Sequence, residues 1–223
     1  MPPQLSPSEF DTRFELPDWR IVNHEIAACF VGPSFAAATE FLARISAEAD
    51  RVAHHPDISL RYPGRVEVAL TTHGAGGLTH EDASLARFIS SLAASSGFEA
   101  TPLPITKFEL AIDALDIDLV LKFWKAVMGY VEARSEPGGP IDSLVDPRRQ
   151  GPALWFQQMD TPRLQRSRMH VDLLVPPDAA SSRIANAVAA GGKVIDDSHA
   201  RSFWVLADPE GNEVCICTWQ DRD

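Results

Sequence analysis

Cysteine and positive charge are scarce in this chain, and long apolar runs are missing. Cys29, Cys215 and Cys217 are an odd number, without the spacing of a zinc finger or a disulfide framework. Basic residues number 20 against 31 acidic ones, and the net charge of −11 disfavours nucleic acid as a partner. No apolar run approaches the ~18 residues of a membrane span, and the first residues lack the pattern of a signal peptide. We therefore expect a reduced, cytoplasmic protein without membrane or nucleic-acid partners.

The 223 residues are enough for one large or two ordinary domains, and 45% of them are hydrophobic. A stretch near the middle, residues 95–104, is rich in serine, glycine and proline and shows no periodicity. We predict a first domain over residues 1–97, a linker over 98–105 and a second domain over 106–223. Both halves mix strand and helix signals, so the predicted fold class is α+β.

The first half alternates helices with pairs of strands. Ser34 is a plausible N-cap for a helix running to about residue 53, whose apolar residues recur every three or four positions. Two strands flank Pro63-Gly64, a hairpin signal, and Thr79 with Asp82 forms a capping box that opens another helix. This order predicts an α/β sandwich, in which helices cover one face of a four-stranded antiparallel sheet.

The second half repeats a pattern of strand, helix and further strands. Expected strands are followed by helices over 116–128 and 178–190, and short strands then close each repeat. The stretch 137–152, rich in proline and glycine, is assigned no strand. Tandem units of this kind suggest an internal duplication, a paired βαβββ domain.

Three histidines dominate the reactive side chains of the first half: His54, His55 and His73. Imidazole can act as acid and as base near neutral pH, so the group suggests proton transfer. Two alternatives stay open. His-His-Pro also serves as a helix stop, and histidines bind zinc, although nearby cysteine and carboxylate ligands are not evident. We assign Asp82 to the capping box alone.

Several ordered motifs of residues 5–97 resemble the pterin-4a-carbinolamine dehydratases. The pieces are Pro17-Asp18-Trp19-Arg20, the helix over 35–41, Asp50-x-x-x-His54-His55-Pro56-Asp57, Tyr62, Thr71-Thr72-His73, and Gly76-Gly77-Leu78-Thr79 followed by Asp82. The resemblance implies a catalytic set of His54, His55 and His73, acting without a cofactor, and a homo-oligomer. It also implies that a pterin substrate is bound by Asp50, Pro56, Thr72, Gly74, Ala75 and Trp19, although Trp19 suits the core equally well.

The chain departs from that family pattern at two places. Asp50 stands where the family often has glutamate, which shortens the side chain by one methylene. The stretch over 62–66 is one residue longer than the commonest spacing. An extra residue within a strand would turn every following side chain to the other face, so we place it in the turn at Pro63-Gly64.

Residues 106–220 resemble the vicinal oxygen chelate superfamily, in its glyoxalase-like and bleomycin-resistance-like branch. The features are the doubled strand–helix–strand pattern, Phe123-Trp124, His170-Val171-Asp172-Leu173 and Ala207-Asp-Pro-Glu-Gly-Asn-Glu213. The resemblance implies a pocket for an unknown small molecule at Glu109, Trp155, His170 and Cys215, with Gln157 a further candidate. Because Cys215 replaces a glutamate, we favour polar residues in a hydrated cup over a divalent metal and assign no metal ligands.

The leading hypothesis is a metal-free 4a-hydroxytetrahydropterin dehydratase fused to a small-molecule-binding domain. One alternative is a module that binds a pterin or a protein without catalysis. Another is a metal-dependent lyase or dioxygenase acting through the second domain. Fold alone does not choose among these.

Overall fold

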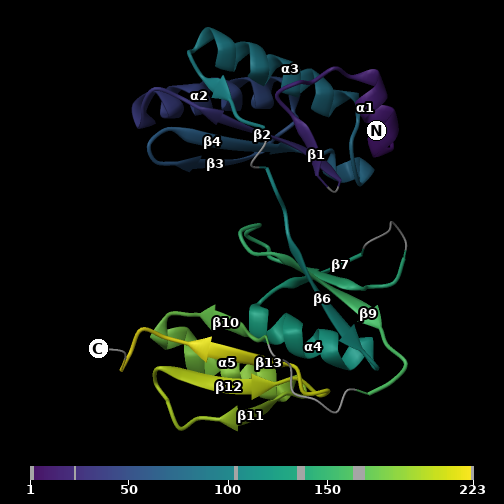
Figure 1. Ribbon diagram of the computed structural model, residues 1–223, viewed down its shortest axis with the longest axis vertical. Helices are drawn as coiled ribbons and strands as arrows, with labels where there is room; N and C mark the ends of the chain where they lie inside the picture. Colours follow the sequence, from purple (N-terminus) through teal and green to yellow (C-terminus); the bar gives the residue numbers. More distant parts are fainter. Residues whose placement is uncertain (1–2, 23, 103–104, 135–138, 163–168, 222–223) are drawn as a thin grey trace. The chain divides into compact units, whose positions relative to one another are not determined.

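A computed structural model describes all residues except 1–2, 23, 103–104, 135–138, 163–168 and 222–223. The chain divides into two compact units, residues 1–107 and residues 108–223 (Figure 1). Both contain helices and sheets, which confirms the α+β class. None of the helices in the described ranges is long and apolar enough to cross a membrane.

The first unit is a sheet with helices on one face (Figure 1). Its strands follow the order β1-β2-β4-β3, with β5 paired to β2, and every pairing is antiparallel. The predicted four strands are therefore present, and β5 is additional. The elements are α1 (Pro7–Arg13), β1 (Arg20–Val22), β2 (Glu25–Val31), α2 (Phe35–Val52), β3 (Asp57–Arg61), β4 (Arg65–Leu70), the 3₁₀ turn η1 (His73–Ala75), α3 (His80–Ser95) and β5 (Glu99–Ala100).

Helix α2 forms because its sequence supplies both an N-terminal cap and an apolar face that is buried. The Ser34 hydroxyl accepts a hydrogen bond from the backbone N–H of Ala37 at 3.1 Å, which caps the first turn. The stripe predicted from the periodicity packs into the core through Ala38, Phe41, Ile45 and Ala49. The helix ends at Val52, and its C-cap residue, Ala53, adopts the left-handed conformation with φ of 52°. That reversal directs the next residue, His54, back toward the protein.

The hairpin between β3 and β4 shows where the extra residue lies. The ladder runs without a break from the pair Asp57–Ala69 to the pair Arg61–Arg65. Residues 62–64 form the turn between them. The additional residue is thus in the turn, as predicted, and the alternation of side chains along both strands is undisturbed.

The predicted start of the linker at residue 98 is wrong. Phe98 is buried, and its ring stacks on Phe41 with centroids 4.4 Å apart. Strand β5 follows and pairs with β2, and the N–H of Thr101 donates to the carbonyl of Cys29 at 2.7 Å. Of the residues that suggested a linker, Ser95 ends α3, and Ser96 and Gly97 form the turn after it, where Gly97 has a φ of 74°.

The second unit contains two copies of the βαβββ pattern. The first copy is β6 (Glu109–Ala114), α4 (Ile117–Met128), β7 (Val131–Ala133), β8 (Ser143–Val145) and β9 (Ala153–Gln158). The second is β10 (Val171–Leu174), α5 (Pro177–Ala189), β11 (Lys193–Asp196), β12 (Phe203–Ala207) and β13 (Glu213–Cys217). Their sheets have matching orders, β6-β9-β8-β7 and β10-β13-β12-β11, and in each the first and last strands are parallel. This matches the predicted duplication, except that β8 lies in a stretch that was assigned no strand.

Two carboxylates tie the copies together. Asp208, buried in the turn before β13, accepts a hydrogen bond from the indole Nε1 of Trp124 on α4 at 3.0 Å. Glu210 in the same turn accepts from the backbone N–H groups of Leu115 and Asp116 at the start of α4. The motifs around Trp124 and Asp208 that carried the second resemblance therefore meet in space and hold the unit together.

Candidate functional site

His54 lies at the C-terminal end of α2 and is 8% exposed. Its backbone N–H donates to the carbonyl of Ala49, so the residue remains attached to the end of the helix. Its Nε2 atom is 2.8 Å from Oδ1 of Asp82 on α3, whose carboxylate is completely buried. A carboxylate that accepts the Nε2 proton fixes the tautomer and the orientation of the ring.

Asp82 is the centre of a hydrogen-bond network that joins α2 to α3. Its second oxygen, Oδ2, accepts from the backbone N–H of Thr79 at 2.7 Å, which completes the predicted capping box. The same oxygen accepts from the Thr72 hydroxyl at 2.8 Å, and that hydroxyl is also 2.8 Å from Oγ1 of Thr79. The prediction that Asp82 only caps α3 is therefore incomplete. One buried carboxylate holds His54 and also the loop that leads into η1.

His55 and His73 are exposed, in contrast to His54. The Nε2 atom of His55 is 3.0 Å from Oδ1 of Asp50, and both side chains are more than 60% exposed. His73 is the first residue of η1 and directly follows Thr72. Among the described residues, the three histidines are not part of any group of side chains close enough to share one metal ion.

The loop that carries His73 is held at both of its ends. The backbone N–H of Thr72 donates to the carbonyl of Gly77 at 3.1 Å, and Gly76 adopts a φ of 74° that few other residues accept. The predicted substrate-binding residues Gly74 and Ala75 form the short turn between them. Both remain accessible at this surface, whereas Gly77 is buried.

Trp19 does not belong to a surface of this kind. It is 4% exposed, lies in the core cluster of the first unit and donates through Nε1 to the hydroxyl of Ser90 at 3.1 Å. The prediction that Trp19 binds substrate is contradicted by its burial, because a ring with that little exposed surface has no face for a ligand. Pro56, another predicted binding residue, is half-buried next to His55 and directly precedes β3.

A hollow of about 300 Å³ lies where the end of α2 faces the start of α3. His54 is part of its wall, together with residues of both helices: Glu48, Arg51, Val52, His80, Glu81, Ser84 and Leu85. The charged side chains Glu48 and Arg51 pair with each other at 2.6 Å. The buried imidazole therefore borders on a space that a small molecule can enter.

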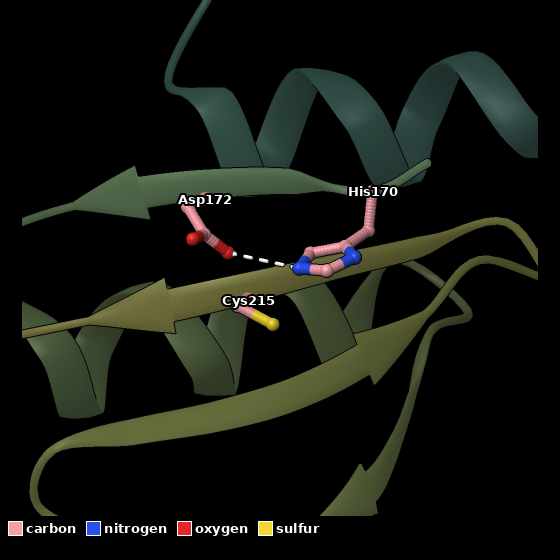
Figure 2. A group of neighbouring side chains, drawn as sticks. All are labelled: His170, Asp172 and Cys215. Atoms are coloured by element: carbon pink, nitrogen blue, oxygen red, sulfur yellow. Dashed lines mark ion pairs between the residues drawn. The ribbon is translucent and has the colours of Figure 1, made fainter. Parts of the chain in front are cut away.

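In the second unit the predicted pocket residues lie on two different sheets. Glu109 and Trp155 are exposed residues of β6 and β9. His170 precedes β10, and Cys215 lies on β13, which is the parallel neighbour of β10. Among the described residues, the only group with metal-ligand character is His170, Asp172 and Cys215, whose ligand atoms all lie within 4.8 Å of one another (Figure 2). Of the pocket residues predicted from sequence, His170 and Cys215 lie together in this group, whereas Glu109 lies outside it and Asp172 was not among the pocket residues predicted.

Cys215 is not an activated nucleophile. Burial raises the pKa of its thiol to about 11, and the carboxylate of Asp172 adds to the effect. A catalytic cysteine needs its thiolate near neutral pH, which comes from a lowered pKa. The environment of Cys215 does the opposite, so the cluster does not have the electrostatics of a cysteine–histidine catalytic pair.

Comparisons with known proteins separate the two units in the same way. The family model described as pterin 4 alpha carbinolamine dehydratase matches residues 3–92. A Chloroflexus aurantiacus protein, provisionally named pterin-4-alpha-carbinolamine dehydratase, is 43% identical over 91 residues, which are 40% of this chain and 97% of that protein. The chain belongs to this family. Its dehydratase domain accounts for the first unit only.

The second unit is a glyoxalase-like domain, whose family model matches residues 109–217. Among solved structures, a Brucella melitensis protein described as a transcriptional coactivator/pterin dehydratase is 31% identical, with a TM-score of 0.38, over 40% of this chain and 98% of its own. A glyoxalase/bleomycin resistance protein/dioxygenase family enzyme from Burkholderia phytofirmans is 20% identical, with a TM-score of 0.39, over 49% of this chain and 95% of its own.

Sequence reasoning undervalued Asp82 because one observation explained it completely. A threonine followed three residues later by an acidic residue is a capping box wherever it occurs. The additional signal was burial: the residues that follow Asp82 continue an apolar stripe, and Asp82 lies on its buried side with Ala83 and Ala86. An acidic residue on a buried face needs a partner, and in the dehydratase domain His54 is that partner.

Proposed function

We propose that the first unit is a 4a-hydroxytetrahydropterin dehydratase, which removes water from a pterin 4a-carbinolamine. The reaction breaks the bond between C4a and its hydroxyl oxygen, which leaves as water after accepting a proton. A base removes the proton of N5, and a double bond forms between C4a and N5. One acid and one base are sufficient, so the reaction needs no metal and no redox cofactor.

The observation that supports this proposal best is the contrast among the three histidines. A general acid or base must come within hydrogen-bond reach of the atom it serves. His55 and His73 are exposed and can meet a substrate, whereas His54 is largely buried and held by Asp82. We therefore propose that His55 and His73 exchange protons with the substrate. His54, held by Asp82, positions the protein surface between those two histidines.

Thr72 supports the same arrangement. Its hydroxyl donates to Asp82, while its backbone begins the turn that carries His73, Gly74 and Ala75. A movement of Asp82 would therefore reach His54 and His73 together. In this proposal the loop backbone binds the flat pterin ring, and Asp50 orients His55 through the 3.0 Å contact.

The test is the rate of 4a-carbinolamine dehydration by the full chain and by two single variants, His55→Ala and His73→Ala. General acid–base groups contribute roughly 10²- to 10⁴-fold, so each variant should lose at least about 100-fold in turnover. His199→Ala is a matched control, since His199 is also exposed but lies in the second unit. A folded wild-type chain without activity would favour a module that binds pterin or protein without catalysis.

The dehydratase family also suggests a homo-oligomer, which we propose for this chain. Light scattering on the full chain tests it: a mass that is a multiple of 24.4 kDa supports self-association, and a mass equal to that value opposes it.

A further inference from the structure

The second unit carries three side chains of different chemistry on one face of its second sheet. Asp172 of β10 and Cys215 of β13 are direct neighbours across the parallel ladder. His170 is two residues before Asp172 and therefore points to the same side. Its Nε2 atom is 3.2 Å from Oδ1 of Asp172, and Figure 2 shows both side chains beside Cys215. The backbone pairing thus brings an imidazole, a carboxylate and a thiol together.

We propose that His170, Asp172 and Cys215 bind a divalent cation of borderline softness, of which Zn²⁺ is the type. Nitrogen, oxygen and sulfur ligands at usual zinc bond lengths lie roughly 3.3–3.6 Å apart around a tetrahedral ion. The histidine and aspartate atoms are 3.2 Å apart, slightly closer than that separation, and all three ligand atoms lie within 4.8 Å of one another. His170 and Asp172 are about half exposed, so their side chains can rotate to close the remaining gap.

The donor set selects among metals. Thiol and imidazole ligands favour zinc over magnesium and calcium, which prefer oxygen ligands only. On binding, the cation replaces the thiol proton of Cys215, which passes to solvent, and a bond between sulfur and metal forms. Three protein ligands leave a fourth position open, as in zinc sites that bind a further molecule.

The open position faces a space large enough for a ligand. The three residues border a hollow of about 560 Å³, together with Ser202, Phe203, Cys217 and Asp221. Phe203 is the first residue of β12, and its ring stacks on His199 with centroids 4.8 Å apart. An anionic or carbonyl oxygen of a small organic molecule is the group that an open zinc position would take.

This site differs from the set implied by the resemblance to the superfamily. That set joins residues of both βαβββ copies, Glu109 of β6 with His170 and Cys215. Within the described residues, Glu109 is not part of the cluster and lies on the other sheet. The proposed site instead lies entirely within the second copy, with Asp172 supplying the carboxylate.

Titration of the untagged full chain with Cd²⁺ and Zn²⁺, after removal of metals with a chelator, tests the proposal. Cadmium reports thiolate ligands through an ultraviolet charge-transfer absorption, and calorimetry gives the Zn²⁺ stoichiometry. We expect one equivalent of each metal, with the cadmium absorption lost in Cys215→Ser and retained in Cys217→Ser. Cys217 is the matched control because it lies two residues further along the same strand and borders the same hollow.

Two carboxylate variants complete the test without disturbing the core. Asp172→Asn should weaken Zn²⁺ binding by roughly tenfold or more, and Glu109→Gln should leave it unchanged. Absence of binding to the folded wild type would overturn the proposal, as would an unchanged cadmium absorption in Cys215→Ser. The proposal would also be overturned if Glu109→Gln weakened Zn²⁺ binding and Asp172→Asn did not. The metal would then be bound by residues of both βαβββ copies.

Discussion

His54 and Asp82 form a buried pair, with 2.8 Å between Nε2 of the imidazole and Oδ1 of the carboxylate. The contact joins the end of α2 to the first turn of α3. Because the other carboxylate oxygen caps α3 and accepts from Thr72, Asp82 links helix packing to the position of the loop with His73. Both the stability and the activity of the dehydratase domain should therefore depend on Asp82.

Replacing Asp82 by asparagine should lower both the stability of the first unit and its dehydration activity. The amide has one acceptor oxygen where the carboxylate has two, so its NH₂ group would face either His54 or the donors Thr72 and Thr79. A buried donor left without an acceptor costs about 1–3 kcal/mol. Urea denaturation should show that loss in the free energy of unfolding, and the dehydration rate should fall in parallel. Unchanged stability would show that the network is not closed as described.

Replacing Asp50 by asparagine should leave stability nearly unchanged, because its pair with His55 is exposed to solvent. Exposed pairs are worth at most about 1 kcal/mol, so we expect no more than about a fivefold fall in turnover. Thermal unfolding together with steady-state kinetics measures both effects. A large loss of stability would mean that the contact is part of the fold, contrary to its exposure.

Phe98→Ala should destabilise the first unit strongly. The ring is buried against Phe41, although the sequence placed it in the linker. Removing a buried phenylalanine side chain typically costs 3–5 kcal/mol, so we expect a loss of about that size in chemical denaturation. Phe108→Ala is a suitable control, since Phe108 is 69% exposed. Equal effects of the two substitutions would contradict the assignment of Phe98 to the core.

Asp146 should make the second unit sensitive to acid. Burial raises the pKa of its carboxyl group, but hydrogen bonds from the backbone N–H groups of Arg148, Gln150 and Gly151, and the charge of Arg148, outweigh this and lower the pKa. A lowered native pKa means that the stabilisation is complete above the unfolded value of about 3.9 and is lost as pH falls through the native value. Asp146→Asn should therefore be less stable than wild type at pH 7, and the difference should shrink toward pH 3. A difference independent of pH would contradict this.

The parts of the fold that sequence predicts are those fixed by local rules. The stripe of α2, the capping box at Thr79 and the turn at Pro63-Gly64 each follow from residues close in the chain. Phe98 was misplaced because its partner Phe41 is distant in sequence and the serine and glycine residues beside it resemble a linker. Strand β8 was missed because its three residues are too few to show an alternation.

In the candidate sites, too, the features fixed by neighbouring residues could be predicted, and those that depend on distant residues could not. The motif around His54 and His55 is readable in sequence, while the partnership with Asp82 depends on how α2 meets α3. Asp172 could have been found from spacing alone, since residues two apart on a strand share a face. The pairing of β10 with β13 places Cys215 beside Asp172, and this pairing could not be predicted from the sequence.

The most direct measurement is the rate of 4a-carbinolamine dehydration by the purified full chain, with His73→Ala measured beside it. We expect clear acceleration by the wild type and a loss of roughly 100-fold or more in the variant, with circular dichroism spectra that coincide. Acceleration that survives the loss of His73 would contradict the assignment of the site. A folded wild type that does not accelerate the reaction would contradict the dehydratase activity itself.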